Sequence, residues 1–289
     1  MDKIINNAPV GSDSTLTDSG FYWLEKGGVK VLVCKPLEDA GFTNGFSTRL
    51  GGVSPFPEND LNLAGFGEDS DMNIAENRGR FLAVFGKDYN LTTVWQVHSD
   101  LVRKITGDGD LGINREKQDG MVSNLEGVLL GVKTADCVPV LIGDPETRSF
   151  ASIHAGWRGT VESIVPKAIR MLRDEYGAEP LNLIAAIGPA AGCESYEIGQ
   201  EVIDAFEKNF STSGKLFKET RPGHALIDLH LANREQLIAA GVNPNNIYAA
   251  PYCTMERTDL FFSYRVEKKK YGKTGRLMSV IGRSRCEKP

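Results

Sequence analysis

Two of the four histidines and one of the five cysteines occupy positions typical of functional side chains. His98 and His154 each end a strand-like run, and Cys137 lies between two further candidate strands. Rigid scaffolds present functional groups at such strand ends and in the turns that follow them. Zinc favours imidazole and thiolate ligands, and three protein ligands leave a fourth position open for water or substrate. These three residues are therefore candidates for a catalytic zinc site, where a bound water can have a pKa of roughly 7.

Two other interpretations of the same residues remain open. The three side chains lie far apart along the chain, without a short C-x-x-C or H-E-x-x-H pair. Two hydrogen-bonded histidines and a buried cysteine would also explain them, because free cysteine is among the most buried residue types. Alternatively, Cys137 is a nucleophile, with His154 as its base and Asp136 or another acid as the group that orients the base.

Two arginines beside glycines are candidates for binding an anion. Arg49 precedes a Gly-Gly pair, and Arg158 lies between Trp157 and Gly159 just before a helical segment. Arginine binds phosphate or carboxylate through two parallel hydrogen bonds, and glycine lets a ligand approach the backbone. A surface salt bridge is the alternative for each. Asn62 is a candidate for orienting a substrate hydroxyl, although Asn is more often a turn-forming residue.

The composition indicates a folded enzyme-sized chain. It has 289 residues, of which 41% are hydrophobic and 25% charged, and both fractions are ordinary for globular proteins. The net charge of -5 argues against a nucleic-acid partner. The sequence has no apolar run near the ~20 residues of a membrane span. Residues 1–20 lack the apolar segment of a signal peptide, so we expect a flexible N-terminal arm on a cytoplasmic protein with reduced thiols.

The elements predict a mixed chain with more strands than helices. Several strands are joined by short turns, which favours an α/β (α+β) fold with mixed sheets flanked by helices, in a single domain over residues 21–289. Pro166 should kink the predicted helix over residues 160–176 or delay its start. The predicted strands are 29–34, 46–48, 92–97, 101–105, 127–133, 138–142, 150–154, 181–187, 246–250 and 277–281. The predicted helices are 70–85, 160–176, 199–209 and 228–240.

Eight motifs, in their order along the chain, resemble the YfiH/laccase-domain family, also called multicopper polyphenol oxidase-like. The resemblance covers about residues 30–283, nearly the whole chain after the arm. The motifs are residues 46–54 (FSTRLGGVS), 60–63 (DLNL), 96–98 (QVH), 119–120 (DG), 134–139 (TADCVP), 154–159 (HAGWRG), 188–189 (GP) and 262–265 (FSYR).

The resemblance implies a single YfiH-like catalytic domain with layered sheets flanked by helices. It implies zinc bound by one cysteine and two histidines, which correspond to Cys137, His98 and His154. The implied activity is phosphorolysis of adenosine, inosine and methylthioadenosine to free base and ribose 1-phosphate, with adenosine deamination. Some members are instead described as peptidoglycan editing factors, and an older label is copper polyphenol oxidase, or laccase. Four histidines are too few for several coppers, so zinc is favoured over copper.

These implications assign roles to the remaining candidates. Phosphorolysis needs an anion pocket near the ribose, which Arg49 and Arg158 could form. Asp136 is assigned to proton transfer or to support of the metal ligands, with capping of a turn as the alternative. The usual zinc deaminase signature, H-x-E with P-C-x-x-C, is absent, so deamination would need a different site geometry.

The leading hypothesis is a zinc-dependent purine nucleoside phosphorylase and adenosine deaminase, whose partners are purine nucleosides and phosphate. The first alternative is a cysteine- or zinc-dependent amide hydrolase that edits peptidoglycan precursors. The second is a non-enzymatic protein in which zinc only ties strands together. Metal content and the effect of alkylating Cys137 separate these hypotheses.

Overall fold

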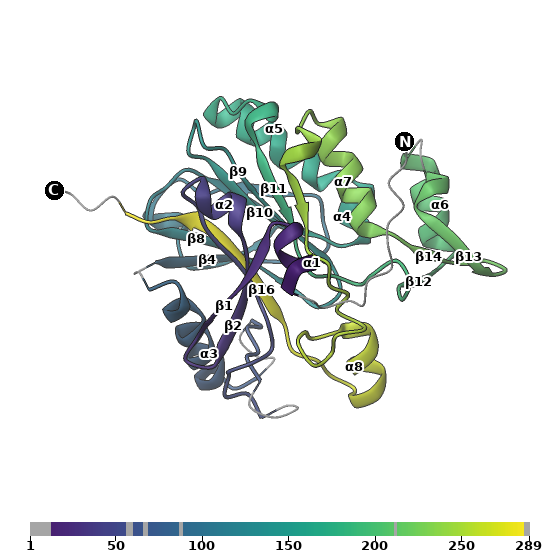
Figure 1. Ribbon diagram of the computed structural model, residues 1–289, viewed down its shortest axis with the longest axis horizontal. Coiled ribbons are helices and arrows are strands. Elements are labelled where there is room, and N and C mark those ends of the chain that lie inside the picture. The colour runs from purple at the N-terminus through teal and green to yellow at the C-terminus, as the bar shows by residue number, and fades with distance from the viewer. Residues whose placement is uncertain (1–12, 56–59, 66–68, 87–88, 211–212, 286–289) are drawn as a thin grey trace.

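Two β-sheets packed face to face form the centre of the molecule (Figure 1). The computed structural model describes residues 13–55, 60–65, 69–86, 89–210, 213–285. Apolar side chains of both sheets meet in one buried cluster, which includes Leu32, Leu130 and Ile281 of one sheet and Leu141 and Phe150 of the other. The fold is therefore the layered, mixed α/β arrangement that the sequence predicts.

The first sheet has seven strands in the order β1-β2-β3-β16-β8-β4-β6. Strand β4 pairs in parallel with β8 and with β6, and the other pairs are antiparallel. The sheet is thus mixed. Its strands are β1 (Phe21–Lys26), β2 (Val29–Cys34), β3 (Thr43–Ser47), β16 (Leu277–Arg283), β8 (Val128–Thr134), β4 (Asn90–Trp95) and β6 (Ile113–Lys117).

The second sheet has six strands in the order β15-β11-β9-β10-β7-β5. Strands β9 and β10 form its buried centre, and all their residues are buried. Continuous apolar runs of this kind are typical of strands covered on both faces. The strands are β15 (Ile247–Ala249), β11 (Ile184–Ile187), β9 (Val138–Gly143), β10 (Phe150–Ala155), β7 (Gly120–Ser123) and β5 (Val102–Lys104).

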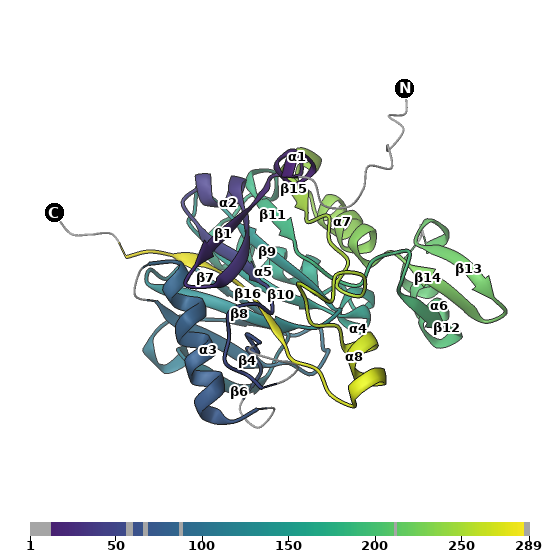
Figure 2. The ribbon, with the colours of Figure 1, turned by 60° about the horizontal axis from the view of Figure 1, so that its bottom comes forward.

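Helices cover the outer faces of both sheets. Helix α3 (Asp71–Val84) packs Phe81 on the outer face of the seven-stranded sheet, against Val29, Val31 and Val280. Ser70 caps the start of this helix, because its Oγ accepts a hydrogen bond from Asn73 N at 3.2 Å. The six-stranded sheet is covered by α4 (Trp157–Val161), α5 (Ile164–Tyr176) and α7 (Leu229–Ala239), as Figure 2 shows.

The predicted helix over residues 160–176 is two helices. Chain direction changes at Ser163, whose φ is +63°. Pro166 lies in the first turn of α5, where its missing N–H has no partner to lose. Proline therefore delays the start of the second helix, which was one of the two predicted effects.

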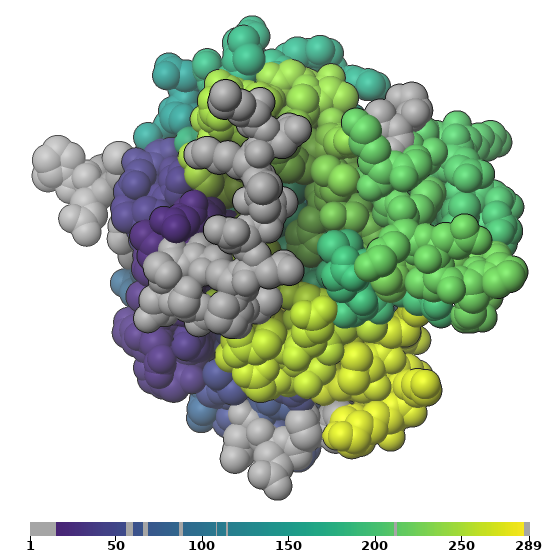
Figure 3. Space-filling model, turned by 45° about the vertical axis from the view of Figure 1, so that its right-hand side comes forward, coloured from purple at the N-terminus to yellow at the C-terminus, as the bar shows by residue number. Residues whose placement is uncertain are grey.

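A small third sheet projects from the side of the molecule and was not predicted. Its strands are β12 (Glu197–Gly199), β14 (His224–Ile227) and β13 (Phe217–Arg221), and it packs with α6 (Gln200–Asn209). Helix α8 (Tyr264–Tyr271) lies next to this projection on the surface in Figure 3. Arg265 joins the two by donating to the Glu197 carbonyl at 2.7 Å.

The N-terminal prediction lies partly outside the described residues, which begin at Asp13. Of the predicted arm, the last part forms α1 (Asp13–Asp18), and Leu16 is buried in the central cluster. The remaining short elements are α2 (Lys35–Asp39) and four 3-10 turns, Asp108–Asp110, Pro180–Asn182, Ser213–Lys215 and Pro244–Asn246. Within the described residues, no helix has the length and apolar character to cross a membrane.

Candidate active site

The three predicted metal ligands converge where the chain passes between the two large sheets. His98 follows β4, Cys137 lies between β8 and β9, and His154 is near the end of β10. Their ligand atoms all lie within 4.8 Å of one another. Cys137 Sγ is 3.8 Å from His98 Nε2, a separation that suits ligands sharing one tetrahedral ion with bonds of about 2.0–2.3 Å.

Asp119 holds the two histidines in place. This fully buried carboxylate accepts hydrogen bonds from the backbone N–H groups of Val97, His98 and Ser99, at 3.1, 3.0 and 2.7 Å. The same carboxylate contacts His154 Nδ1 at 2.7 Å. His98 has a φ of +61°, which is strained for a non-glycine residue. The backbone bonds to Asp119 offset that strain.

The contact with Asp119 decides which nitrogen of His154 is free. Since Nδ1 faces the carboxylate, Nε2 is left to face the other two ligands. Burial lowers the pKa of His154, but Cys137 and Asp119 outweigh burial and raise it to about 9. Burial raises the pKa of Asp119, but hydrogen bonds from His154 and Ser99 lower it to about 2.

The Cys137 thiol lies in surroundings that favour its thiolate form. Burial raises the pKa of this thiol, but the imidazoles of His154 and His98 outweigh burial and lower it to about 6. A divalent ion requires the same deprotonated sulfur and takes the place of the proton. The donor set and its electrostatics therefore fit a zinc ion.

Gly156 leaves room beside the ligands. A Cβ at this position would lie 3.0 Å from His98 Cδ2 and 3.2 Å from Cys137 Sγ. Both contacts are tight, so a larger residue would displace the ligands. This is the physical reason for a glycine directly after the His154-Ala155 pair, and it agrees with a site built to hold its ligands closely.

Asp136 is directed away from the two histidines. Its carboxylate accepts hydrogen bonds from Thr254 Oγ1 at 2.7 Å, Ser263 Oγ at 3.1 Å and Arg265 N at 2.7 Å. Burial raises its pKa. Of the two possibilities for the acid that orients His154, Asp136 or another acid, the structure shows the second, because Asp119 makes that contact. Asp136 instead connects the Cys137 turn to the start of α8.

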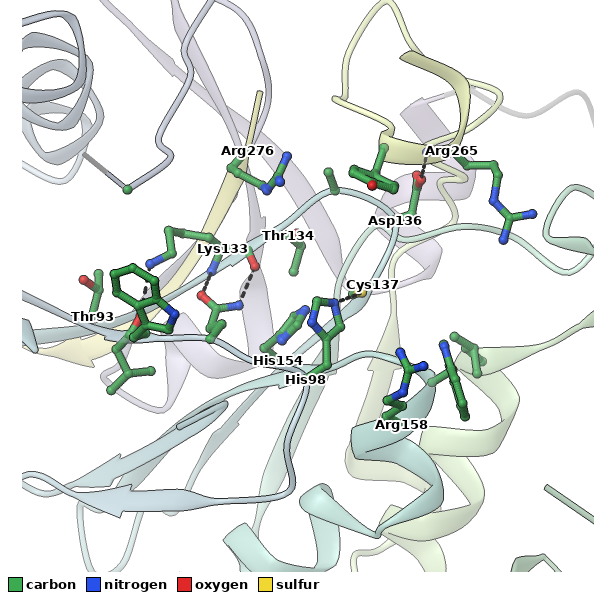
Figure 4. Close-up of a pocket in the computed structure, with 18 of the residues that line it drawn as sticks. Thr93, His98, Lys133, Thr134, Asp136, Cys137, His154, Arg158, Arg265 and Arg276 are labelled. Carbon is green, nitrogen blue, oxygen red and sulfur yellow. Dashed lines mark hydrogen bonds between the residues drawn. The ribbon is translucent and has the colours of Figure 1, made fainter. Parts of the chain in front are cut away.

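A cavity of about 950 Å³ opens over the three ligands (Figure 4). Aromatic side chains on its wall include Trp95, Trp157, Tyr196 and Tyr264. A volume of this size lies near the top of the range of roughly 300–1,000 Å³ for pockets that bind small molecules. The aromatic walls suit a planar ligand, since aromatic rings stack on flat π-systems.

Arg158 lines this cavity, as a substrate-binding residue must. Its guanidinium packs over the Trp157 ring at 4.2 Å and lies 3.7 Å from the Glu201 carboxylate. The side chain is 56% exposed, and exposed ion pairs are worth little. Arg158 therefore remains able to turn toward an anionic ligand.

Arg49 and Asn62 do not line the cavity. Arg49 makes two hydrogen bonds to the Asp60 carboxylate, at 3.0 and 2.7 Å, and a third to Glu267 at 2.9 Å. Asn62 Oδ1 accepts from the backbone N–H groups of Ala64 and Arg276. The prediction that Arg49 grips phosphate is corrected because buried carboxylates occupy its guanidinium. Asn62 has the turn-forming role that was the alternative.

Replacing Arg49 with methionine is expected to destabilise the fold. The side chain of Arg49 is 7% exposed, and its loss would leave Asp60 and Glu267 buried without a cation. Breaking buried pairs of this kind costs about 3–5 kcal/mol. Denaturant unfolding of Arg49→Met measures the loss, and Arg173→Met, at an exposed position on α5, is the matched control with little change. Equal stability of the two variants would contradict the structural role.

Comparison with known proteins identifies the family of this chain. Residues 43–284 match the model of the family described as multi-copper polyphenol oxidoreductase laccase. The chain belongs to this laccase-domain family. Its relatives include the purine nucleoside phosphorylase YlmD of Geobacillus stearothermophilus, which is 33% identical over 87% of this chain and 94% of the relative. The purine nucleoside phosphorylase YfiH of Shigella flexneri is also 33% identical, over 81% and 91%.

Solved structures of the laccase-domain family share the fold. The crystal structure of YlmD from Geobacillus stearothermophilus has a TM-score of 0.83 at 32% identity and covers 92% of this chain and 99% of its own. The hypothetical protein YfiH of Bacillus licheniformis has the same TM-score at 30% identity, covering 91% and 99%.

The family description mentions several copper ions, so the positions of the other two histidines matter. His224 hydrogen-bonds to the Pro222 carbonyl and His230 to the Gly188 carbonyl. Among the described residues, the trio of His98, Cys137 and His154 is the one group placed to hold a metal ion. Two imidazoles and one thiolate make a donor set for a single metal ion.

Sequence reasoning missed several residues of the laccase-domain site. Asp119 stood in a motif, but it was given no role. The groups that contact it belong to residues at least 20 positions away: the backbone N–H groups of residues 97–99, the Ser99 hydroxyl and the His154 imidazole. Arg265 and Tyr264 also line the cavity. In sequence they follow Phe261 and Phe262, a position compatible with a pocket wall or with the edge of an aromatic core.

Proposed function

We propose that this protein is a zinc-dependent purine nucleoside phosphorylase that also deaminates adenosine. The observation that carries the proposal is the convergence of His98, Cys137 and His154 beneath a cavity with aromatic and cationic walls. The names of the relatives support the same substrate class. The substrates are adenosine, inosine and methylthioadenosine, and the products of phosphorolysis are the free base and ribose 1-phosphate.

The roles follow from where the side chains lie. A zinc ion on the three ligands would supply a Lewis acid and a more acidic water. The aromatic wall holds the purine by stacking. Arg158 and Arg265, at the starts of α4 and α8, bind the phosphate beside the ligands. Asp136 fixes the position of Arg265 relative to the Cys137 turn, because its carboxylate accepts a hydrogen bond from Arg265 N.

Turnover of adenosine with and without phosphate tests the proposal. Purified protein with measured zinc content should convert adenosine to adenine and ribose 1-phosphate only when phosphate is present. Inosine should form without phosphate, because deamination uses water. No product from metal-loaded protein under either condition would contradict the proposed function.

A cysteine-dependent amide hydrolase is the second candidate, and one observation favours it. The Asp119 carboxylate, the His154 imidazole and the Cys137 thiol form the acid, base and nucleophile arrangement of cysteine hydrolases. This candidate requires metal-free protein to be active on a peptidoglycan-precursor amide and to lose that activity on alkylation of Cys137. Full activity of the metal-free protein on adenosine would exclude the zinc mechanism instead.

A further inference from the structure

The wall of the cavity carries an excess of positive charge. Six basic residues line it, and Asp136 is the one acidic residue among the described lining residues. The six are Arg78, Arg115, Lys133, Arg158, Arg265 and Arg276. This excess stands out in a protein whose net charge is -5. A cleft of one sign concentrates ligands of the opposite sign, and crowding like charges costs free energy that a bound anion offsets.

Four of the six basic residues fall into two groups on different elements. Arg158 and Arg265 belong to the helices α4 and α8. Lys133 is on β8 and Arg276 immediately precedes β16. Figure 4 shows these two groups on opposite sides of the metal ligands.

The strand register explains why Lys133 and Arg276 share one side. Lys133 is opposite Met278 in the antiparallel pair of β8 and β16. Side chains two residues apart on a strand point to the same face, so Arg276, Met278 and Lys133 share the face that α3 covers. The cavity extends along this face, since Gly65 also lines it.

We infer that Lys133 and Arg276 form a second anion subsite, which takes the 5′-phosphate of a nucleoside monophosphate. The inference rests on the proposed function, in which inorganic phosphate binds at Arg158 and Arg265. Phosphorolysis consumes one inorganic phosphate, so one anion subsite is enough for a plain nucleoside. The second group of cations therefore matches an anion that belongs to the nucleoside itself.

Aromatic residues at the same end of the cavity favour a nucleotide over a simple anion. Trp95 ends β4, lines the cavity and is 59% exposed. The Arg276 guanidinium lies 5.8 Å from the centre of the Tyr264 ring. A flat apolar surface beside a guanidinium and an ammonium is the combination that recognises a base and a phosphate together.

Calorimetric binding of adenosine 5′-monophosphate and of adenosine to the purified holoenzyme tests the subsite. The monophosphate should bind at least tenfold more tightly than adenosine, as a charge-assisted hydrogen bond predicts, and the advantage should shrink at high salt. In saturating inorganic phosphate, the monophosphate should keep most of its advantage in affinity over adenosine, because inorganic phosphate binds at Arg158 and Arg265. Equal binding of the two ligands, or complete competition by inorganic phosphate, would overturn the second subsite.

Substitutions of Arg276 and Lys133 test whether these two residues bind the 5′-phosphate. Arg276→Met and Lys133→Met should each weaken binding of the monophosphate about tenfold and weaken adenosine binding far less, while Arg276→Lys should restore part of the loss. Arg173→Met is the matched surface control. If the advantage of the monophosphate survives the double variant, the inference fails. Failure of adenosine turnover with intact monophosphate binding would overturn the proposed function and leave the subsite standing.

Discussion

Cys137→Ala is expected to remove the bound metal and lower kcat/KM for adenosine by about three orders of magnitude or more. The thiolate is one of three ligands within 4.8 Å of one another, and two imidazoles alone hold zinc poorly. The fold should persist, because Cys137 belongs to none of the three buried apolar clusters. Elemental analysis, steady-state kinetics and thermal unfolding measure the three effects.

Cys193→Ala is the matched control for the loss of a thiol. Cys193 is exposed and lies outside the cavity, so this variant should keep its metal and its activity. Metal and activity retained in Cys137→Ala would refute the candidate site. A large drop in melting temperature for Cys137→Ala, together with no turnover by the wild-type protein, would instead support the non-enzymatic hypothesis in which zinc ties strands together.

Asp119→Asn is expected to weaken metal binding by about 10–100-fold, which is typical when a residue that supports a metal ligand is changed. An amide presents N–H donors where the backbone N–H groups of Val97, His98 and Ser99 now point. Leaving one such buried group without an acceptor costs about 1–3 kcal/mol. Competition with a chelator measures metal affinity, and denaturant unfolding of the metal-free protein measures the loss of stability separately.

Asp100→Asn provides the control on the same loop. Asp100 pairs with Lys167 at the partly exposed surface, where an ion pair is worth about 0–1 kcal/mol. This variant should bind metal as the wild-type protein does. The positioning role of Asp119 would be ruled out if both variants bound metal with unchanged affinity.

The sequence by itself determined the elements whose signals are local. The Ser70 cap marks the start of α3, and the continuous apolar runs mark β9 and β10. Local signals are enough here because caps and burial periodicity act over a few residues. The three candidate metal ligands were also named from the sequence, where the family resemblance favoured them over two hydrogen-bonded histidines and a buried cysteine.

The short strands of the third sheet could not be predicted from local signals in the sequence. Strands β12 and β13 are short, and β13 is largely exposed, so neither carries a strong periodic signal. They exist because β14 pairs with both of them and Phe217 packs on α6. Pairing partners decide such strands, and a strand shorter than a few residues has little propensity of its own.

Only the tertiary structure decided the roles of the charged residues. Arg49 and Arg158 look alike in sequence, because both stand within two residues of a glycine. Yet Arg49 pairs with a carboxylate 218 positions away, and Arg158 lines the cavity. Likewise, Asp136 adjoins Cys137 in sequence, but Asp119 contacts His154. An ion pair or hydrogen bond depends on distance in space, and residue type sets only which partners are possible.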